Sequence, residues 1–247
     1  MELNVNLHRF GDPRPLALVV GHERAGNHFL MNAIAACCGY STTPYIDLDH
    51  PEININFHQP DLIENVLNGL AAEHAANVVK SHHHAAFFAP IVDQLADHVQ
   101  IFYIHRDPVA VIESFWRFVH GWPWAEGPKV GSVVEFALAQ PEGRLMRYQM
   151  HQHDSMLRRW QAHAESWLSL AAKHDHVTAL RYENLRDGYD DCMAEICAIL
   201  GCSLETFPAP DRDDYIKAVS DDALTISDDE HDALGALVRG TIQSDIL

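Results

Sequence analysis

Lys80 and His82 lie two residues apart, directly after the apolar pair Val78-Val79. On a β-strand, residues i and i+2 share a face, so we expect the two side chains to point together. A histidine beside a lysine suits a reaction that removes a proton and stabilises negative charge. In a chain with 18 histidines, a structural role for His82 is the alternative. Three consecutive histidines on a strand cannot all bind one metal ion, so we predict no metal site at residues 82–84.

A second candidate is the loop GHERAGNHFL, residues 21–30, which follows the apolar run 16–20. A strand, two glycines and a helix start are typical of a phosphate-binding loop, whose backbone amides and helix dipole favour an anion. A nucleoside triphosphatase places Lys and Ser or Thr after the second glycine. Asn27 and His28 occupy those positions here, which argues against a magnesium-dependent triphosphatase. Arg24 adds a positive charge to the loop; the alternative is a turn that binds no ligand.

A third candidate begins at Arg106, directly after the apolar run 99–104 and a histidine. The pair Asp107-Pro108 is typical of a helix start, with Asp as N-cap and Pro in the first turn. Ser114 lies two helical turns further on, about 10 Å along the axis, and returns to the same face. An arginine fork and a hydroxyl so placed can bind one phosphate between them. The alternative is that Arg106 pairs with Asp107.

Apolar runs alternate with helical patterns, which predicts an α/β fold: a central parallel sheet between two layers of helices. Ligands of such sheets bind at the carboxyl ends of the strands, where the three candidates lie. We expect a single domain over residues 1–247 and loops over 40–60 and 120–143, the second covering a site. The predicted strands are 16–20, 77–82, 99–104 and 176–181. The predicted helices are 27–38 ending at Gly39, 61–76 capped by Asp61, one from 107, 146–173, and 187–200 ending at Gly201.

The order of these motifs, followed by Tyr182-Glu183-Asn184-Leu185, resembles the cytosolic type of sulfotransferase that uses 3′-phosphoadenosine-5′-phosphosulfate (PAPS). Members of that family have a phosphosulfate-binding loop, then a Lys-Thr-His strand. An Arg-Asp-Pro segment with a serine eight residues after the arginine follows, and then a Tyr-Glu-Asp-Leu segment. The resemblance covers roughly residues 15–201. It implies a P-loop NTPase-like sulfotransferase fold and a sulfonate transfer that needs no metal.

The resemblance also implies a role for each motif residue. His82 would be the general base, and Lys80 would stabilise charge on the bridging oxygen. Arg24, which replaces the family's usual lysine, would contact the 5′-phosphate or the transferring sulfonate. The other implied cofactor contacts are Ala25, Gly26, Asn27 and His28 at the 5′-phosphate, Arg106 and Ser114 at the 3′-phosphate, and Phe29 and Tyr182 at the adenine. The product would be adenosine 3′,5′-bisphosphate (PAP).

The sequence departs from the family pattern at several positions. Arginine in place of lysine exchanges a point charge for a planar fork. His28 replaces the usual threonine and is a second candidate base. The Arg-Lys-Gly segment that closes over the cofactor in many members is absent. Arg239-Gly240 is a weak candidate for part of that role, and the alternative is that it ends a surface helix. Trp160 and Trp167, a heptad apart, indicate core packing. Five aromatics could line an acceptor pocket or belong to the core: Phe115, Trp116, Phe118, Trp122 and Trp124.

Net charge and composition restrict the classes of molecule that the protein is expected to bind. The net charge of −18 argues against nucleic acid, anionic membranes and sulfated polysaccharides. We therefore expect a small neutral or cationic acceptor bearing a hydroxyl or amine. No stretch approaches the roughly 18 apolar residues of a membrane span, and no signal pattern begins the chain, so we expect a cytoplasmic protein with five reduced cysteines. A small-metabolite kinase and a non-catalytic nucleotide-binding relative are the alternatives.

Overall fold

The computed structural model describes residues 14–48, 59–74, 77–202, 207, 209–210 and 224–242. Five parallel strands form one sheet in the order β2-β3-β1-β4-β5. The strands are β1 (Leu16–Val20), β2 (Ser41–Asp47), β3 (Asn77–Ser81), β4 (Val99–His105) and β5 (Val177–Arg181). The central strand is β1, and its neighbours β3 and β4 carry two of the three candidate motifs at their carboxyl ends.

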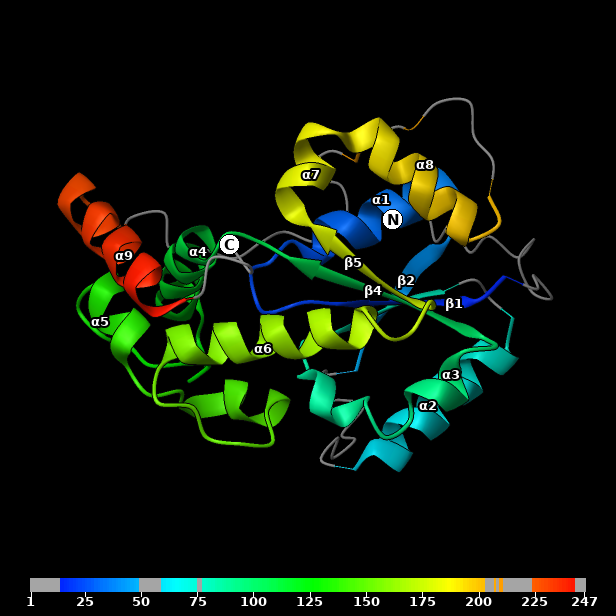
Figure 1. Cartoon of the computed structure of the whole chain (residues 1–247), viewed down its shortest axis with the longest axis horizontal. Coiled ribbons are helices and arrows are strands. Elements are labelled where there is room, and N and C mark those ends of the chain that lie inside the picture. The colour runs from blue at the N-terminus through cyan, green and yellow to red at the C-terminus, as the bar shows by residue number, and fades with distance from the viewer. Residues whose placement is uncertain are drawn as a thin grey trace.

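Helices cover both faces of the sheet, which confirms the three-layer α/β prediction (Figure 1). One face carries α1 (Asn27–Cys38), α7 (Tyr182–Asp187) and α8 (Tyr189–Ile199). The other face carries α2 (Pro60–Ala72), α3 (Val92–Leu95) and α6 (Met156–Ala171). A third group packs beyond the end toward which the strands point: α4 (Pro108–Gly121), α5 (Val133–Leu138) and α9 (Asp228–Thr241). Two 3-10 helices, η2 (Ala85–Phe87) and η3 (Gly143–Tyr148), complete the described elements.

The strands form because their apolar runs are buried from both sides. All five residues of β1 are buried, as are the first six residues of β4. Successive side chains of β1 enter opposite layers, with Leu18 among the residues packed on α2 and α6 and Val19 among those packed on α1 and α8. Continuous apolar runs of this kind are typical of parallel strands covered on both faces.

The helix boundaries confirm several sequence signals. Asp107 caps α4 by accepting a 2.9 Å hydrogen bond from the Ala110 backbone N–H. Gly39 ends α1 in the left-handed conformation with φ 66°, and Gly201 follows α8 with φ 68°. The prediction for Asp61 was wrong, because Gln59 is the N-cap of α2 and Asp61 lies in the first turn.

The prediction of a loop over residues 40–60 was wrong at its beginning and end. Residues 41–47 form the edge strand β2, and α2 begins at Pro60, while 49–58 lie outside the described residues. The pairing register between β2 and β3 shifts between Ser41 and Ile46, the interval that contains Pro44. Proline lacks the N–H that a ladder needs and is tolerated on an edge strand or at a bulge. Pro44 therefore suggested a loop in a segment that is an irregular edge strand.

Two further segments differ from prediction. The expected loop 120–143 contains α5, whose N-terminus is a capping box between Ser132 and Glu135. The long helix begins at Met156 instead of residue 146, because Ser155 caps it and η3 occupies the preceding segment. The last expected helix, 187–200, corresponds to α8, and the preceding α7, which meets α8 at Gly188, was not predicted.

The aromatic side chains divide between core and surface. Trp160 and Trp167 are buried, which confirms core packing. Phe115 and Trp116 are also buried, whereas Trp124 is 51% exposed. All five cysteines carry free thiols. None of the helices within the described ranges has the length and apolar composition that crossing a membrane requires.

Candidate active site

His82 lies directly after β3, and both of its ring nitrogens are engaged. Its Nδ1 is 2.7 Å from the Gly21 carbonyl oxygen, and its Nε2 is 3.1 Å from the Lys80 ammonium. A carbonyl only accepts and an ammonium only donates, so Nδ1 carries the proton and Nε2 carries the lone pair. Lys80 and His82 therefore point together, as the strand spacing predicted. A neutral imidazole with a lone pair at Nε2 is the form that a general base requires.

The three consecutive histidines contact different neighbours. The His83 ring nitrogen Nδ1 lies 2.8 Å from the Ser81 hydroxyl. The His84 ring stacks on His153, with ring centroids 5.2 Å apart. The three imidazoles therefore belong to three separate contacts, and His82 is the one beside Lys80.

The loop after β1 has the geometry of an anion-binding turn. Arg24 and Gly26 both adopt positive φ, 69° and 111°. A Cβ atom at Gly26 would lie 2.4 Å from Cδ2 of Tyr182, so only glycine fits there. The Asn27 side chain is buried and donates to the Gly21 and Ser81 carbonyls, 3.3 Å from each. No side chain in the described ranges caps α1, so the N–H groups of its first turn can bind an anion.

The third motif meets this loop. Arg24 Nε donates to the Ser114 hydroxyl across 3.0 Å, and Arg106 Nη1 donates to the Arg24 carbonyl across 3.3 Å. The Arg24 guanidinium also lies over the Phe118 ring, 5.1 Å from its centroid. The Asp107 carboxylate caps α4, while the Arg106 side chain contacts the loop. Three predicted phosphate contacts thus come together from two segments, the loop and the third motif.

Two predicted adenine contacts also lie side by side. The rings of Phe29, on α1, and Tyr182, on α7, meet edge to face with centroids 6.1 Å apart. The Arg106 guanidinium lies over the Tyr182 ring, 4.6 Å from its centroid. Ala25 is buried within the loop, and His28 is half-buried in the first turn of α1. The carboxyl ends of β1, β3, β4 and β5 therefore bring all predicted site residues to one end of the sheet.

Residues 21–224 match the protein family described as Sulfotransferase domain, and the matched range contains every predicted site residue. The chain belongs to the sulfotransferase family. No curated protein matches this sulfotransferase.

Solved structures share the fold of this sulfotransferase at low sequence identity. Mouse sulfotransferase SULT7A1 complexed with PAP has a TM-score of 0.52 and 15% identity, covering 80% of this chain and 65% of its own. A sulfotransferase from Alicyclobacillus acidocaldarius has a TM-score of 0.50 and 16% identity, covering 92% of each chain. Retinol dehydratase in complex with androsterone and inactive cofactor PAP has a TM-score of 0.50 and 16% identity, covering 80% of this chain and 63% of its own. This sulfotransferase thus spans less than two thirds of the mouse protein and of retinol dehydratase.

Several residues of this sulfotransferase site were not predicted. Glu183 accepts from the Asp107 backbone N–H across 3.0 Å and from Arg181 Nε across 3.1 Å, so it ties α7 to the start of α4. Burial raises the pKa of Glu183, but the hydrogen bonds from Asp107 and Arg181 outweigh burial and leave it lowered. The sequence signal for Glu183 was its place in the Tyr-Glu-Asn-Leu segment, but only Tyr182 of that segment was given a predicted role.

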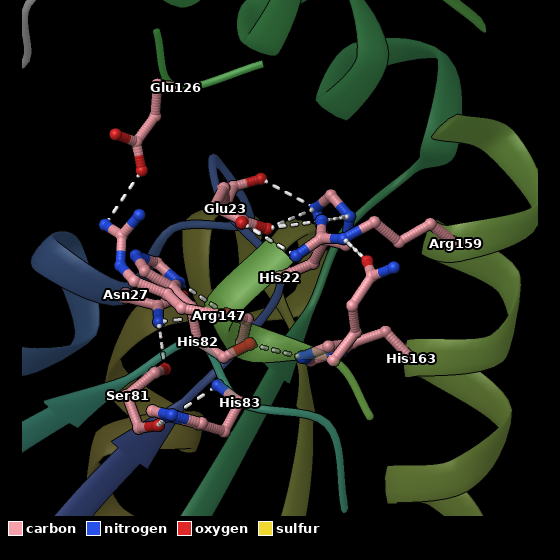
Figure 2. Close-up of polar contacts among 12 residues, drawn as sticks. His22, Glu23, Asn27, Ser81, His82, His83, Glu126, Arg147, Arg159 and His163 are labelled. Atoms are coloured by element: carbon pink, nitrogen blue, oxygen red, sulfur yellow. Dashed lines mark hydrogen bonds and ion pairs between the residues drawn. The ribbon is translucent and has the colours of Figure 1, made fainter. Parts of the chain in front are cut away.

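Glu126 and Arg147 form a second unpredicted pair (Figure 2). Arg147 Nη2 is 2.8 Å from Glu126 Oε1, and the Glu126 side chain is 7% exposed. Burial raises the pKa of Glu126, and the neighbouring Arg147 opposes that effect. Arg147 also lies over the Tyr148 ring, whose centroid is 5.5 Å from that of His82. Nothing in the sequence pattern indicated this pair, because Glu126 stands in an irregular segment and no local pattern links it to Arg147 in η3.

A third unpredicted contact lies beneath the loop, where the buried Arg159 of α6 meets Glu23. The sequence did carry a signal for Arg159. It is a charged residue on the same helical stripe as His163, one turn on, and Trp167, two turns on, and both of these are buried. An arginine on an apolar stripe requires a buried partner.

Proposed function

We propose that this sulfotransferase moves the sulfonate group of PAPS to a hydroxyl or amine of a small acceptor, with His82 as general base. The observation that carries this proposal is the Gly21–His82–Lys80 arrangement, in which the Gly21 carbonyl fixes the base-competent tautomer of His82. The arrangement stands beside a loop whose backbone favours an anion.

The residues around the loop suit the three parts of PAPS. The uncapped first turn of α1 and the Arg24 guanidinium suit the 5′-phosphosulfate, with Ala25, Gly26, Asn27 and His28 supplying backbone and side-chain donors. Arg106 and Ser114 suit a 3′-phosphate, which ATP lacks. Phe29 and Tyr182 offer aromatic faces to an adenine. The PAP named in the neighbouring structures is consistent with this assignment.

The transfer requires positioning and charge stabilisation, as phosphoryl transfer does. The acceptor atom bonds to sulfur as the bond from sulfur to the bridging oxygen breaks, and the electron pair stays on that oxygen as PAP leaves. His82 Nε2 takes the acceptor proton. Lys80, which donates to Nε2 in the free protein, is expected to turn to the leaving oxygen, and Arg24 adds positive charge there. The step uses no metal ion.

The acceptor is proposed to be a small neutral or cationic molecule. The net charge of −18 disfavours an anionic acceptor. One of the neighbouring structures, retinol dehydratase, holds androsterone, a small molecule. The group of the acceptor that receives the sulfonate is either a hydroxyl or an amine.

Calorimetry with PAP and with ATP plus magnesium tests the donor assignment. We expect PAP to bind tightly and ATP weakly, with no dependence on magnesium. Tight binding of ATP without a response to PAP would instead support a small-metabolite kinase. A panel of phenols, alcohols and amines, assayed with PAPS, tests the acceptor class, and turnover of polyanionic glycans alone would contradict it.

A further inference from the structure

A buried ion pair joins the loop to α6 (Figure 2). The Arg159 side chain is 0% exposed and that of Glu23 is 6% exposed. Arg159 Nη1 lies 2.7 Å from Glu23 Oε2, and Nη2 lies 2.8 Å from Oε1. Two parallel hydrogen bonds fix the direction of the carboxylate as well as its distance.

The same guanidinium makes two further hydrogen bonds. Arg159 Nη1 donates to His22 Nε2 across 2.7 Å, and Nε donates to Gln149 Oε1 across 2.8 Å. His22 Nδ1 donates to the Glu23 carbonyl across 3.0 Å, so His22 is neutral with its proton on Nδ1. Burial lowers the pKa of His22 to about 4. Burial also raises the pKa of Glu23, but Arg159 outweighs burial and holds that pKa well below its usual range.

The pair fixes a strained part of the loop. Arg24, the residue after Glu23, has φ 69°, a backbone conformation that residues other than glycine rarely adopt. Its neighbours hold it in place from both sides. The Glu23 side chain is fixed by Arg159, while Arg106 and Ser114 bind the backbone and side chain of Arg24.

The contact of Arg159 with Gln149 reaches the segment that packs against His82. Gln149 follows Tyr148, whose ring packs on His82 with centroids 5.5 Å apart. One guanidinium thus anchors both the loop that carries Arg24 and the segment that lies against the base. Apolar residues of similar volume fill a core equally well or better, so packing alone does not account for a buried charge pair here.

We propose that Glu23 and Arg159 are positioning residues that hold the loop in its anion-binding conformation before the donor arrives. Neither residue touches the substrate. The proposal rests on the proposed function in one respect, that the loop binds the 5′-phosphosulfate. If the loop without the clamp adopts that conformation about one tenth of the time, the affinity for PAP falls about tenfold.

The test removes both charges together, because a variant that removes one leaves the other buried without a counter-ion. The double variant Glu23→Gln/Arg159→Gln keeps polar groups at both positions. We expect cooperative melting, about tenfold weaker PAP binding, and a kcat/KM for PAPS about 100-fold lower, since small misplacements cost such factors. Amide hydrogen exchange across residues 22–30, measured without ligand, is expected to accelerate.

Two controls separate positioning from general stability. Leu95→Ala empties a fully buried position on α3, at the opposite end of the sheet, and should lower the Tm without changing PAP affinity. Arg186→Gln/Asp187→Asn removes an ion pair whose side chains are 56% and 64% exposed and should change neither property. If the double variant fails to fold, Arg159→Lys, which keeps the charge and loses the fork, takes its place with the same expected loss of PAP affinity.

A folded variant with wild-type PAP affinity and wild-type exchange across residues 22–30 would overturn the proposal. If the wild-type protein does not bind PAP, the proposed function fails, and the exchange measurement still decides the clamp. Faster exchange at the loop in the double variant, with unchanged exchange in the Leu95→Ala control, supports it. Equal exchange in both variants contradicts it.

Discussion

Arg24 and Ser114 stand 90 residues apart in the chain and are joined by a 3.0 Å hydrogen bond from Nε to the hydroxyl. The bond links the loop, where the 5′-phosphosulfate is proposed to bind, to α4, where the 3′-phosphate is proposed to bind. A ligand that carries both groups would engage both residues, which suits a nucleotide with phosphates at two positions.

The first prediction concerns the 3′-phosphate. Arg106→Gln and Ser114→Ala should each weaken PAP binding by about 10- to 100-fold, because each removes a hydrogen bond to a charged group. Binding of AMP, which has no 3′-phosphate, should weaken by a smaller factor, because Arg106 and Ser114 also support Arg24 in the loop. Calorimetry with both nucleotides measures the difference, and equal losses for PAP and AMP would contradict the assignment.

The second prediction concerns adenine. Phe29→Ala should weaken PAP and AMP alike, by about 5- to 100-fold, because stacking on an aromatic ring contributes about 1–3 kcal/mol per base. Phe29→Trp should preserve or strengthen binding of both. A Phe29→Ala variant with unchanged nucleotide affinity would remove the adenine from this part of the site.

The third prediction concerns the loop backbone. Gly26→Ala should destabilise the protein by about 1–3 kcal/mol and abolish PAP binding, because φ is 111° and the new Cβ would collide with Tyr182. Gly69→Ala is the matched control. Gly69 lies within α2 with no atom within 4 Å of the added Cβ, so the change should stabilise by about 0.5–1 kcal/mol. Urea unfolding measures both, and a neutral Gly26→Ala would refute the strained-loop geometry.

The fourth prediction concerns acid stability. Burial lowers the pKa of His22 to about 4 and lowers the pKa values of His84 and His163 well below 6.5. Between these values and 6.5 the unfolded chain binds protons that the folded chain does not, so stability falls as the pH falls. Each histidine contributes about 1.4 kcal/mol per pH unit over its range.

The slope of unfolding free energy against pH, from pH 7 to pH 4, measures this effect. His84→Phe should reduce the slope, because the unfolded chain then takes up one proton fewer over this range. Glu113 raises the pKa of the exposed His231, so a replacement at His231 should change the slope mainly above pH 6.5 and leave it nearly unchanged at lower pH. A stability that stays flat down to pH 4 would contradict the neutral, buried state of these imidazoles.

The sequence predicted those parts of the fold that depend on local patterns. The β1 and β4 runs are apolar throughout because both faces are buried, and Asp107-Pro108 and Gly39 mark helix ends through local hydrogen bonding and backbone conformation. The edge strand β2 was missed because Pro44 is a loop signal that only tertiary context overrides.

The residues of the candidate site likewise divide into those that local sequence patterns predict and those that they do not. Lys80 and His82 were predicted because strand periodicity alone places them on one face. The contact between Arg159 and Glu23 joins residues 136 positions apart, and no local pattern names the partner of a buried arginine. Glu126 was missed because its irregular segment carries no periodicity from which burial can be read, and no local pattern names Arg147 as its partner.

The most direct test of the central claim measures turnover and PAP affinity of the His82→Ala variant with PAPS and a reactive acceptor. We expect kcat to fall by about 100- to 10,000-fold, the range contributed by a general base, while PAP affinity stays near that of the wild type. His28→Ala is the matched control and should weaken PAP binding while turnover at saturating PAPS persists. A His82→Ala enzyme with near-normal turnover would contradict the account and transfer the base role to His28 or another group.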